Sequence, residues 1–212
     1  MATTRASKST RPKTSSRRPQ NGARQRDAIA ILKADHREVE QLFKAFEKTS
    51  DRASVERRRL VDSMIEKLSR HAAIEEQIVY PWARAHIVDA DDKVLEAFEE
   101  HSLVKFLLGE LAAMDAEDER FAAKTTVLTE IVRHHVKEEE SELLLDLRDV
   151  ATRAELLELG RQLEAAQRTA PTTPGLEGFI PAAGSSVGAA LDHARDVGRG
   201  VVTKVGALTG LD

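Results

Sequence analysis

The sequence predicts an all-α protein: an up-down-up-down four-helix bundle with an additional C-terminal helix and flexible tails. Three observations predict this fold. Residues 27–167 contain one proline and two glycines and are rich in Ala, Leu, Glu, Arg and Lys, a composition of good helix formers. Apolar residues recur there at steps of three and four. Short polar breaks divide the span into segments whose lengths suit neighbouring helices of a bundle.

The first half of the predicted bundle has two helices, from about residue 27 to a break at 49–51 and from about 53 to 80. Pro81 marks the end of the second helix or a kink near it. The first inward face carries Ile29, Leu32, His36, Val39, Phe43 and Phe46. The second inward face carries Leu60, Met64, Leu68, His71, Glu75 and Ile78. Both faces thus set polar side chains among apolar ones.

The second half follows a connector at 85–89 and repeats this design. A third helix begins near Asp91 and ends before a break at 114–118, and a fourth continues to about Leu147. The third inward face carries Val94, Phe98, His101, Val104, Leu108 and Leu111. The fourth carries Val127 or Leu128, then Ile131, His135, Glu139, Leu143 and Leu147. A shorter fifth helix, about 152–168, offers Leu156, Leu159 and Leu163 and is expected on the outside or at one end of the bundle.

Composition divides the chain into four parts: a basic arm (1–26), the bundle (27–150), the fifth helix (151–170) and a Pro/Gly-rich linker with a mobile tail (171–212). The arm holds eight Lys or Arg and no acid, so the other 186 residues carry about −12. So few apolar residues predict disorder. Such an arm can contact nucleic acid. Because no aromatic residue is interleaved with its charges, a merely solvated arm is the favoured reading.

The absence of cysteine excludes disulfides, thiolate metal sites and cysteine nucleophiles. Any metal must therefore be held by imidazole and carboxylate groups, which suit iron, manganese or zinc. No apolar run reaches the length of a membrane span. The basic N-terminus lacks an apolar signal-peptide segment, so a cytoplasmic location without membrane attachment is expected.

An internal repeat selects the candidate site residues. Asp35-His36 and Glu100-His101 both begin the pattern [DE]-H-x-x-V-x-x-L, and HxxxEE occurs at His71 and again at His135. The two HxxxEE copies lie 64 positions apart, and within each the histidine and the first glutamate, Glu75 or Glu139, share one helix face. The repeat therefore predicts that His36, His71, Glu75, His101, His135 and Glu139 meet in one layer of the core.

Such a layer indicates bound metal. A single core histidine is usually structural, but six buried polar groups in one layer need a compensating charge, because each unpartnered group costs about 1–3 kcal/mol. Two cations supply that charge, and each glutamate can bridge both. Six ligands leave coordination positions open, which is typical of a reactive or sensing site rather than a structural one. A polar network without metal is the alternative.

These motifs resemble the hemerythrin family, specifically its bacterial HHE cation-binding branch, over about residues 27–150. The resemblance rests on Asp35-His36, the first HxxxEE motif followed by Tyr80-Pro81, Glu100-His101 and the second HxxxEE motif. It implies a non-heme di-iron centre with an oxo or hydroxo bridge in a four-helix bundle. The implied terminal ligands are His36, His71, His101 and His135, and the implied bridges are Glu75 and Glu139.

The chain departs from the oxygen-carrying hemerythrins, which have five histidine ligands. Ala97 stands four positions before His101, where those proteins have a histidine, so an O2-carrier role is in doubt. Either His86 or Tyr80 is a candidate for the missing ligand; otherwise His86 is a surface residue and Tyr80 plugs the bundle end. Glu76, Glu138 and Glu140 either accept hydrogen bonds from ligand imidazoles or are solvated. His134 points about 100° away from its neighbour and is assigned to the helix flank.

Two functions follow as expectations. The first is a di-iron protein that binds or senses O2, peroxide or NO, with catalase-like peroxide turnover as a reaction of the same centre. The alternative is an iron- or redox-responsive regulatory module without turnover. A metal-free helical bundle is the third reading. The partner protein and the oligomeric state do not follow from the sequence.

Overall fold

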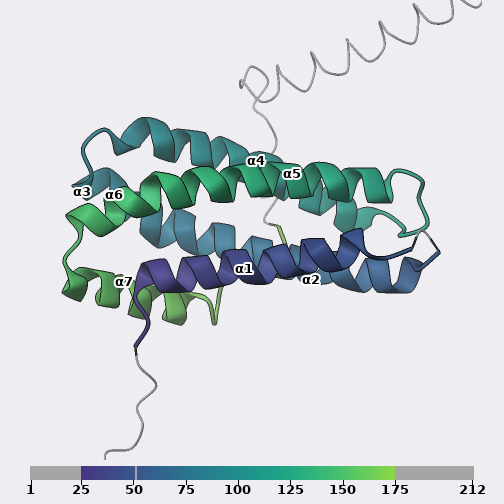
Figure 1. The fold of residues 1–212 in the computed structure, drawn as a ribbon, viewed down its shortest axis with the longest axis horizontal. Coiled ribbons are helices and arrows are strands. Elements are labelled where there is room, and N and C mark those ends of the chain that lie inside the picture. The colour runs from purple at the N-terminus through teal and green to yellow at the C-terminus, as the bar shows by residue number, and fades with distance from the viewer. Residues whose placement is uncertain (1–24, 51, 175–212) are drawn as a thin grey trace, which may run out of the picture.

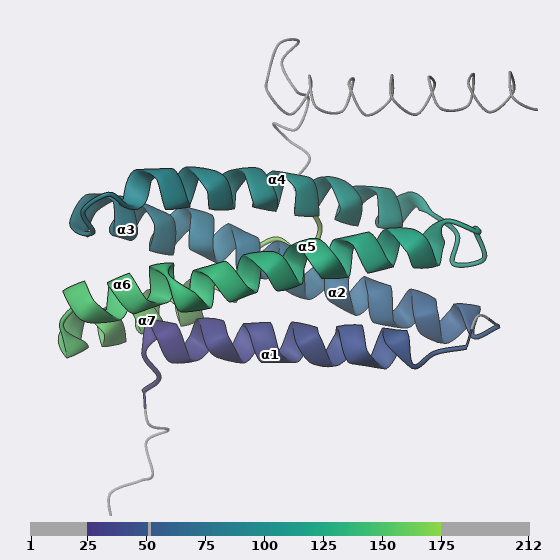
Figure 2. The same ribbon diagram turned by 45° about the horizontal axis from the view of Figure 1, so that its top comes forward.

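The structure is a computed structural model that describes residues 25–50 and 52–174. The regular elements of these residues are all helical, which confirms the predicted all-α class. Four long helices lie side by side and alternate in direction (Figure 1, Figure 2). They are α1 (Ala28–Glu47), α2 (Ser54–Ile74), α4 (Ala90–Ala113) and α5 (Phe121–Ser141). The predicted up-down-up-down bundle is therefore confirmed.

The helix that begins as α2 does not end at Pro81. It passes through a π-helical turn, η1 (Glu75–Val79), into α3 (Tyr80–His86). Proline has no N–H and its ring clashes with the carbonyl four residues earlier in an α-helix. The π turn shifts the pairing by one residue, so that the Tyr80 N–H bonds to the Glu75 carbonyl, and the helical path continues past the proline. The wider turn also changes the inward residue, since Val79 is buried and Ile78 only partly so.

The predicted fourth helix is divided at Glu142, whose φ of −128° and ψ of −75° leave the helical region. The chain resumes as α6 (Leu143–Val150). Leu143 and Leu144, adjacent in sequence, are both buried after this break. Earlier in α5, Leu128 and not Val127 faces the core, because Val127 is 46% exposed.

The fifth helix, α7 (Arg153–Ala166), lies along the N-terminal half of α1 (Figure 1). A capping box begins it: the Thr152 hydroxyl accepts from the Glu155 N–H, and the Glu155 carboxylate accepts from the Thr152 N–H. At Gly160, α7 comes close to the backbone just before α1. A Cβ at this position would lie 2.3 Å from the carbonyl oxygen of Arg26. Only glycine permits this approach, which buries Leu159 and Leu163 against the bundle.

The buried apolar side chains form two separate clusters. One fills the end of the bundle closed by α3, α6 and α7, around residues such as Ile31, Tyr80 and Leu147. The other fills the opposite end, around Phe43, Met64 and Leu108. The buried histidines and glutamates belong to neither cluster. The core is therefore interrupted by one polar layer.

The predicted division of the chain into four parts remains a prediction. Most of the basic arm (1–26) and of the C-terminal linker and tail (171–212) lies outside the described residues. No helix within the described ranges is both long and apolar enough to cross a membrane.

Candidate metal centre

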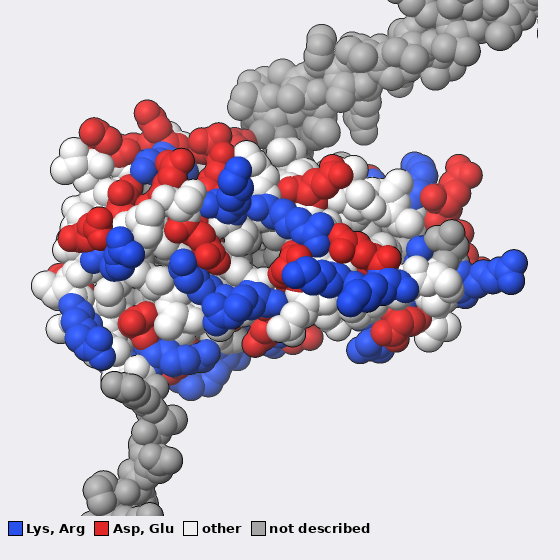
Figure 3. All heavy atoms as spheres, in the orientation of Figure 1, with Lys and Arg blue, Asp and Glu red and all other residues white. Residues whose placement is uncertain are grey.

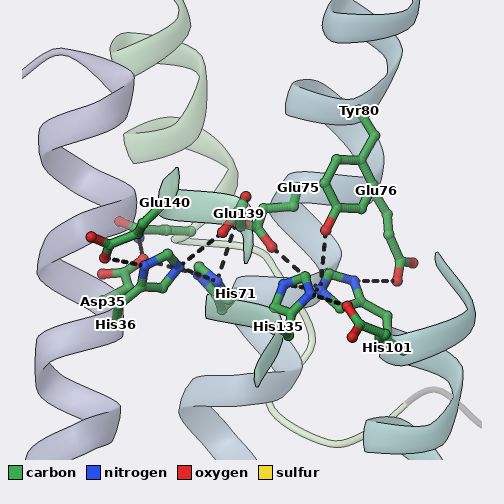
Figure 4. A network of polar contacts seen from close by, with 12 residues as sticks. Asp35, His36, His71, Glu75, Glu76, Tyr80, His101, His135, Glu139 and Glu140 are labelled. Carbon is green, nitrogen blue, oxygen red and sulfur yellow. Dashed lines mark hydrogen bonds and ion pairs between the residues drawn. The ribbon is translucent and has the colours of Figure 1, made fainter. Parts of the chain in front are cut away.

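The six side chains selected by the repeat meet in the polar layer between the two apolar clusters (Figure 4). They project from α1, α2, η1, α4 and α5, so every long helix contributes. Each is at most 6% exposed. The six are His36, His71, Glu75, His101, His135 and Glu139.

Three contacts join the first half of the layer. The Nε2 atoms of His36 and His71 lie 3.1 Å apart. Glu139 Oε2 lies 3.1 Å from His36 Nε2, and Glu75 Oε1 lies 3.2 Å from His71 Nε2. One possible ligand atom from each of these four residues lies within 4.8 Å of the other three, so the group can hold a metal ion.

The second half of the layer uses the same glutamate. The Nε2 atoms of His101 and His135 lie 3.2 Å apart, and Glu75 Oε2 lies 3.4 Å from His101 Nε2. Glu75, His101 and His135 form a second group that can hold a metal ion. Because one Glu75 oxygen faces each group, its carboxylate lies between them.

The donor set fits a cation at each group. Both oxygens of Glu75 and both oxygens of Glu139 are buried and lack a hydrogen-bond partner. Burial and the neighbouring charge of Glu139 hold the pKa of Glu75 well above its ordinary value. Burial lowers the pKa of His101 to about 4, so this imidazole is neutral at pH 7, the form that binds metal. Two buried carboxylates without donors are costly in a protein core, and metal ions remove that cost.

Acidic side chains accept a hydrogen bond from the Nδ1 atom of three of the four imidazoles. The Nδ1–H of His36 donates to Glu140 at 2.8 Å, and that of His101 donates to Glu76 at 3.0 Å. Such bonds orient a histidine so that its other nitrogen faces the metal. Glu76 and Glu140 are thus hydrogen-bond acceptors and not merely solvated. The carboxylate of Glu138 instead forms an ion pair with the exposed His134 at 3.3 Å and faces no histidine of the layer.

The acids of the [DE]-H motif, Asp35 and Glu100, lie beside histidines of the neighbouring helix, a role that the sequence pattern does not predict. Glu100 accepts from Nδ1 of His135 at 2.8 Å. Asp35 stands in the equivalent place for His71, but its nearest oxygen is 3.8 Å from Nδ1 and accepts instead from Gln167 at 2.8 Å. The repeat itself contains the signal, since each acid directly precedes a site histidine.

The structure places Tyr80 and not His86 beside the layer. The Tyr80 hydroxyl lies 3.2 Å from His101 Nε2 and the ring is fully buried. In an α-helix a residue five positions on points about 140° away, but a turn closed by an i→i+5 bond returns it to the same face. The π turn therefore brings Tyr80 to the side of Glu75. His86 is exposed, stacks on Trp82 and bonds to its carbonyl oxygen at 2.8 Å.

Among the hollows that reach the layer, two adjoin more than one of its six side chains. A small apolar cavity of about 20 Å³, enough for one water-sized molecule, is lined by the four histidines together with Val39, Leu68, Ala72, Val104, Val132 and Val136. A larger pocket of about 110 Å³ lies between α4 and the end of α5 and reaches His135 and Glu139. The first suits a small uncharged molecule, and the second is lined mainly by carboxylates.

Two known proteins are similar to this chain in sequence. The chain is 28% identical over 119 residues to a protein named DNA nickase from Nostoc sp., covering 56% of this chain but only 33% of that protein. It is 26% identical to an uncharacterized hemerythrin-like protein of Schizosaccharomyces pombe, covering 68% of this chain and 70% of that one. The chain thus spans about a third of the first relative and 70% of the second.

A solved structure and a family profile lead to one assignment. The crystal structure of a hemerythrin HHE cation binding domain-containing protein from Mycobacterium kansasii superposes with a TM-score of 0.59 at 25% identity, covering 68% of this chain and 86% of that one. The profile of the hemerythrin HHE cation binding domain matches residues 27–147. The chain belongs to the hemerythrin HHE cation-binding domain family.

Proposed function

We propose that this protein holds two non-heme iron ions in the polar layer and uses them to bind or sense O2, peroxide or nitric oxide. Catalase-like turnover of peroxide is part of this proposal. The observation that carries it is the set of four buried carboxylate oxygens of Glu75 and Glu139, none of which makes a hydrogen bond. Iron would supply redox chemistry that none of the side chains in this layer can perform.

The proposed ligands are the six residues of the layer. His36 and His71 would hold one ion, His101 and His135 the other, and Glu75 and Glu139 would bridge them. The position of Glu75 between the two groups supports its bridging role. The imidazole and carboxylate donors favour iron over magnesium or calcium, which prefer oxygen ligands.

Surrounding residues would orient the ligands and exclude water. Glu76, Glu100 and Glu140 keep the protons of three imidazoles on Nδ1. The valines around the small cavity leave space for one small molecule and no polar group for it except the site itself. Ala97 occupies the place of the extra histidine of oxygen carriers and lines the larger pocket. The small side chain of Ala97 leaves this pocket open beside His135 and Glu139, which supports reactivity with peroxide over reversible O2 transport.

Metal analysis and spectroscopy test the proposal. Protein purified from iron-replete cells is expected to contain about two irons per chain and to show visible bands of a bridged ferric pair. Added peroxide should be consumed, and Glu75→Ala or His135→Ala should abolish both the bands and the consumption. Protein that folds but takes up no iron would overturn the proposal.

A regulatory module without turnover is the second candidate, and a contact with nucleic acid would be its output. The basic arm and the likeness to a protein named DNA nickase support it. In this case iron-loaded protein would bind DNA without consuming peroxide. Gel-shift measurements on the full chain and on a chain lacking residues 1–24, with and without iron, separate the two candidates. Because phosphate contacts depend on salt, binding should weaken steeply between 50 and 200 mM salt (roughly the range over which such contacts are lost).

A further inference from the structure

The pocket that reaches His135 and Glu139 is strongly acidic. It is bounded by α4 on one side and by α5 and the start of α6 on the other, and has a volume of about 110 Å³. Five glutamates and one lysine carry charge in its wall: Glu96, Glu100, Glu138, Glu139, Glu142 and Lys93. The lysine is itself paired with Glu142 at 3.3 Å and with Asp146 at 2.8 Å. The pocket therefore presents a clear excess of negative charge.

The inner end of this pocket is a buried carboxylate that makes no hydrogen bond, although His36 Nε2 lies 3.1 Å from one of its oxygens. Glu139 lines the pocket, its side chain is 2% exposed, and neither of its oxygens has a hydrogen-bond partner. A buried carboxylate without a hydrogen bond at the end of an acidic pocket indicates a cation as the occupant, because an anion or a neutral molecule would not compensate the negative charge of the pocket.

The rim of the pocket carries a further set of cation ligands. Glu100 and Glu138 both line it, and the exposed His134 lies 3.3 Å from Glu138 and 3.8 Å from Glu100. Atoms of these three residues lie close enough together to hold a metal ion. The two oxygens of Glu100 face different residues, since Oε2 accepts from the proposed ligand His135 while Oε1 lies toward His134. One carboxylate thus connects the rim with the layer.

The other two large openings toward the layer have the opposite balance. The hollow at His71 is lined by Arg26, Lys67 and Arg70 against two acids, Asp35 and Glu38. The groove at His36, about 530 Å³, is lined by Arg37, Arg133 and Lys137 against Glu40 and Glu140. Figure 3 shows basic side chains in a row over α1 and α5, while acidic ones gather over the first turns of α4. A cation approaching the layer is therefore attracted to one opening and repelled from two.

We propose that this acidic pocket is the loading route for divalent metal, with His134, Glu100 and Glu138 as a transient binding site at its rim. The inference rests on the proposed function, since it assumes that the layer takes up metal. Borderline divalent cations such as Fe2+ and Co2+ are the matching class, because the rim offers one imidazole and two carboxylates. A pocket lined by one sign of charge concentrates ions of the other sign and raises their rate of association.

The test measures the rate of metal uptake by the full chain separately from its end point. Metal-free protein is mixed with Co2+ in a stopped-flow instrument, and the visible absorption of bound Co2+ is followed. Glu96→Gln/Glu138→Gln removes two pocket charges without altering a proposed ligand, and His134→Ala removes the rim imidazole. Both variants are expected to load about 3- to 10-fold more slowly at low ionic strength. The final absorption should equal that of the unmodified chain.

A matched control removes the same charge elsewhere. Glu38→Gln/Glu66→Gln lies on α1 and α2, and Glu38 lines the hollow at His71. This variant should load at the unmodified rate. Added salt should slow metal uptake by the unmodified protein and narrow the difference in rate between it and the pocket variant, because screening weakens the attraction between the cation and the carboxylates.

The outcomes separate the two proposals. Equal loading rates in all variants, or equal slowing in the control, would overturn the loading route while leaving the metal layer intact. Failure of the unmodified chain to bind Co2+ or Fe2+ at all would overturn the proposed function and the route with it. Slow loading with a full end point in the pocket variants supports the route.

Discussion

The Nδ1–H of His36 donates a hydrogen bond to Glu140 at 2.8 Å, and this bond crosses from the first helical hairpin to the second. The bond from His101 to Glu76 crosses in the opposite direction at 3.0 Å. In each case the second glutamate of one HxxxEE motif orients a histidine of the other hairpin. The two halves of the bundle therefore complete each other's site.

These crossed bonds predict a loss of metal affinity without loss of fold. Glu140→Gln and Glu76→Gln should each weaken Fe2+ or Co2+ binding about 10- to 100-fold, because a neutral amide oxygen accepts the imidazole N–H more weakly than a carboxylate does and no longer makes the histidine more basic. Competition with a chelator of known affinity measures the effect. Glu66→Gln is the control, since Glu66 pairs with Arg70 on α2 and belongs neither to the layer nor to the acidic pocket. Equal affinity in all three variants would contradict the role of the crossed bonds.

Glu75→Gln should stabilise the metal-free protein and prevent normal metal binding. At neutral pH an unpartnered buried carboxylate costs about 1–3 kcal/mol, and a neutral amide costs less. Urea denaturation of metal-free protein measures the gain. Loss of stability in the metal-free state would show that Glu75 has a structural partner.

The pH dependence of this gain has a definite sign. The pKa of Glu75 is raised by burial above its ordinary value of 4.5, so the folded protein keeps a proton that the unfolded chain releases. Its contribution to stability is present at low pH and is lost as the pH rises through the folded-state pKa. The difference between Glu75→Gln and the unmodified protein should therefore grow with rising pH. A stability difference that became smaller with rising pH would contradict the raised pKa of Glu75.

Metal removal should lower the melting temperature. Metal bound only by the folded state adds about 2.7 kcal/mol at a free concentration 100 times the dissociation constant. Differential scanning calorimetry with and without a strong chelator tests this, and Mg2+ at the same concentration is the control. An unchanged melting temperature after chelation would mean that the layer is stable without metal.

Tyr80→Phe should change the visible spectrum of the iron-loaded protein, whereas His86→Ala should not. The Tyr80 hydroxyl lies 3.2 Å from His101 Nε2, while His86 is exposed and bonded to Trp82. Phenylalanine keeps the buried ring and its packing on Phe98. A spectral change in His86→Ala alone would show that His86, and not Tyr80, affects the iron site.

Gly160→Ala should destabilise the protein by about 1–3 kcal/mol, because the added methyl group overpacks the contact with the Arg26 carbonyl. Gly109→Ala, in the interior of α4, is the control and should be neutral or stabilising by up to about 1 kcal/mol. Denaturant midpoints measure both. A neutral Gly160→Ala would mean that α7 shifts freely on α1.

The sequence by itself determined the all-helical class, the main helical segments and the six polar residues of the layer. Helix formation depends on neighbours three and four positions apart, and His135 with Glu139 is such a pair. The repeat then placed the second pair, His71 and Glu75, at an equivalent position in the other hairpin.

Only the tertiary structure decided which acid holds which histidine and how the layer is reached. Glu140 meets His36, and Asp35 falls short of His71, because of the distances and rotations between packed helices, which no local pattern encodes. Tyr80 reaches the layer through a π turn that an i+3 and i+4 periodicity does not describe. The acidic pocket likewise combines residues of α4, α5 and α6 that become neighbours only when the helices pack.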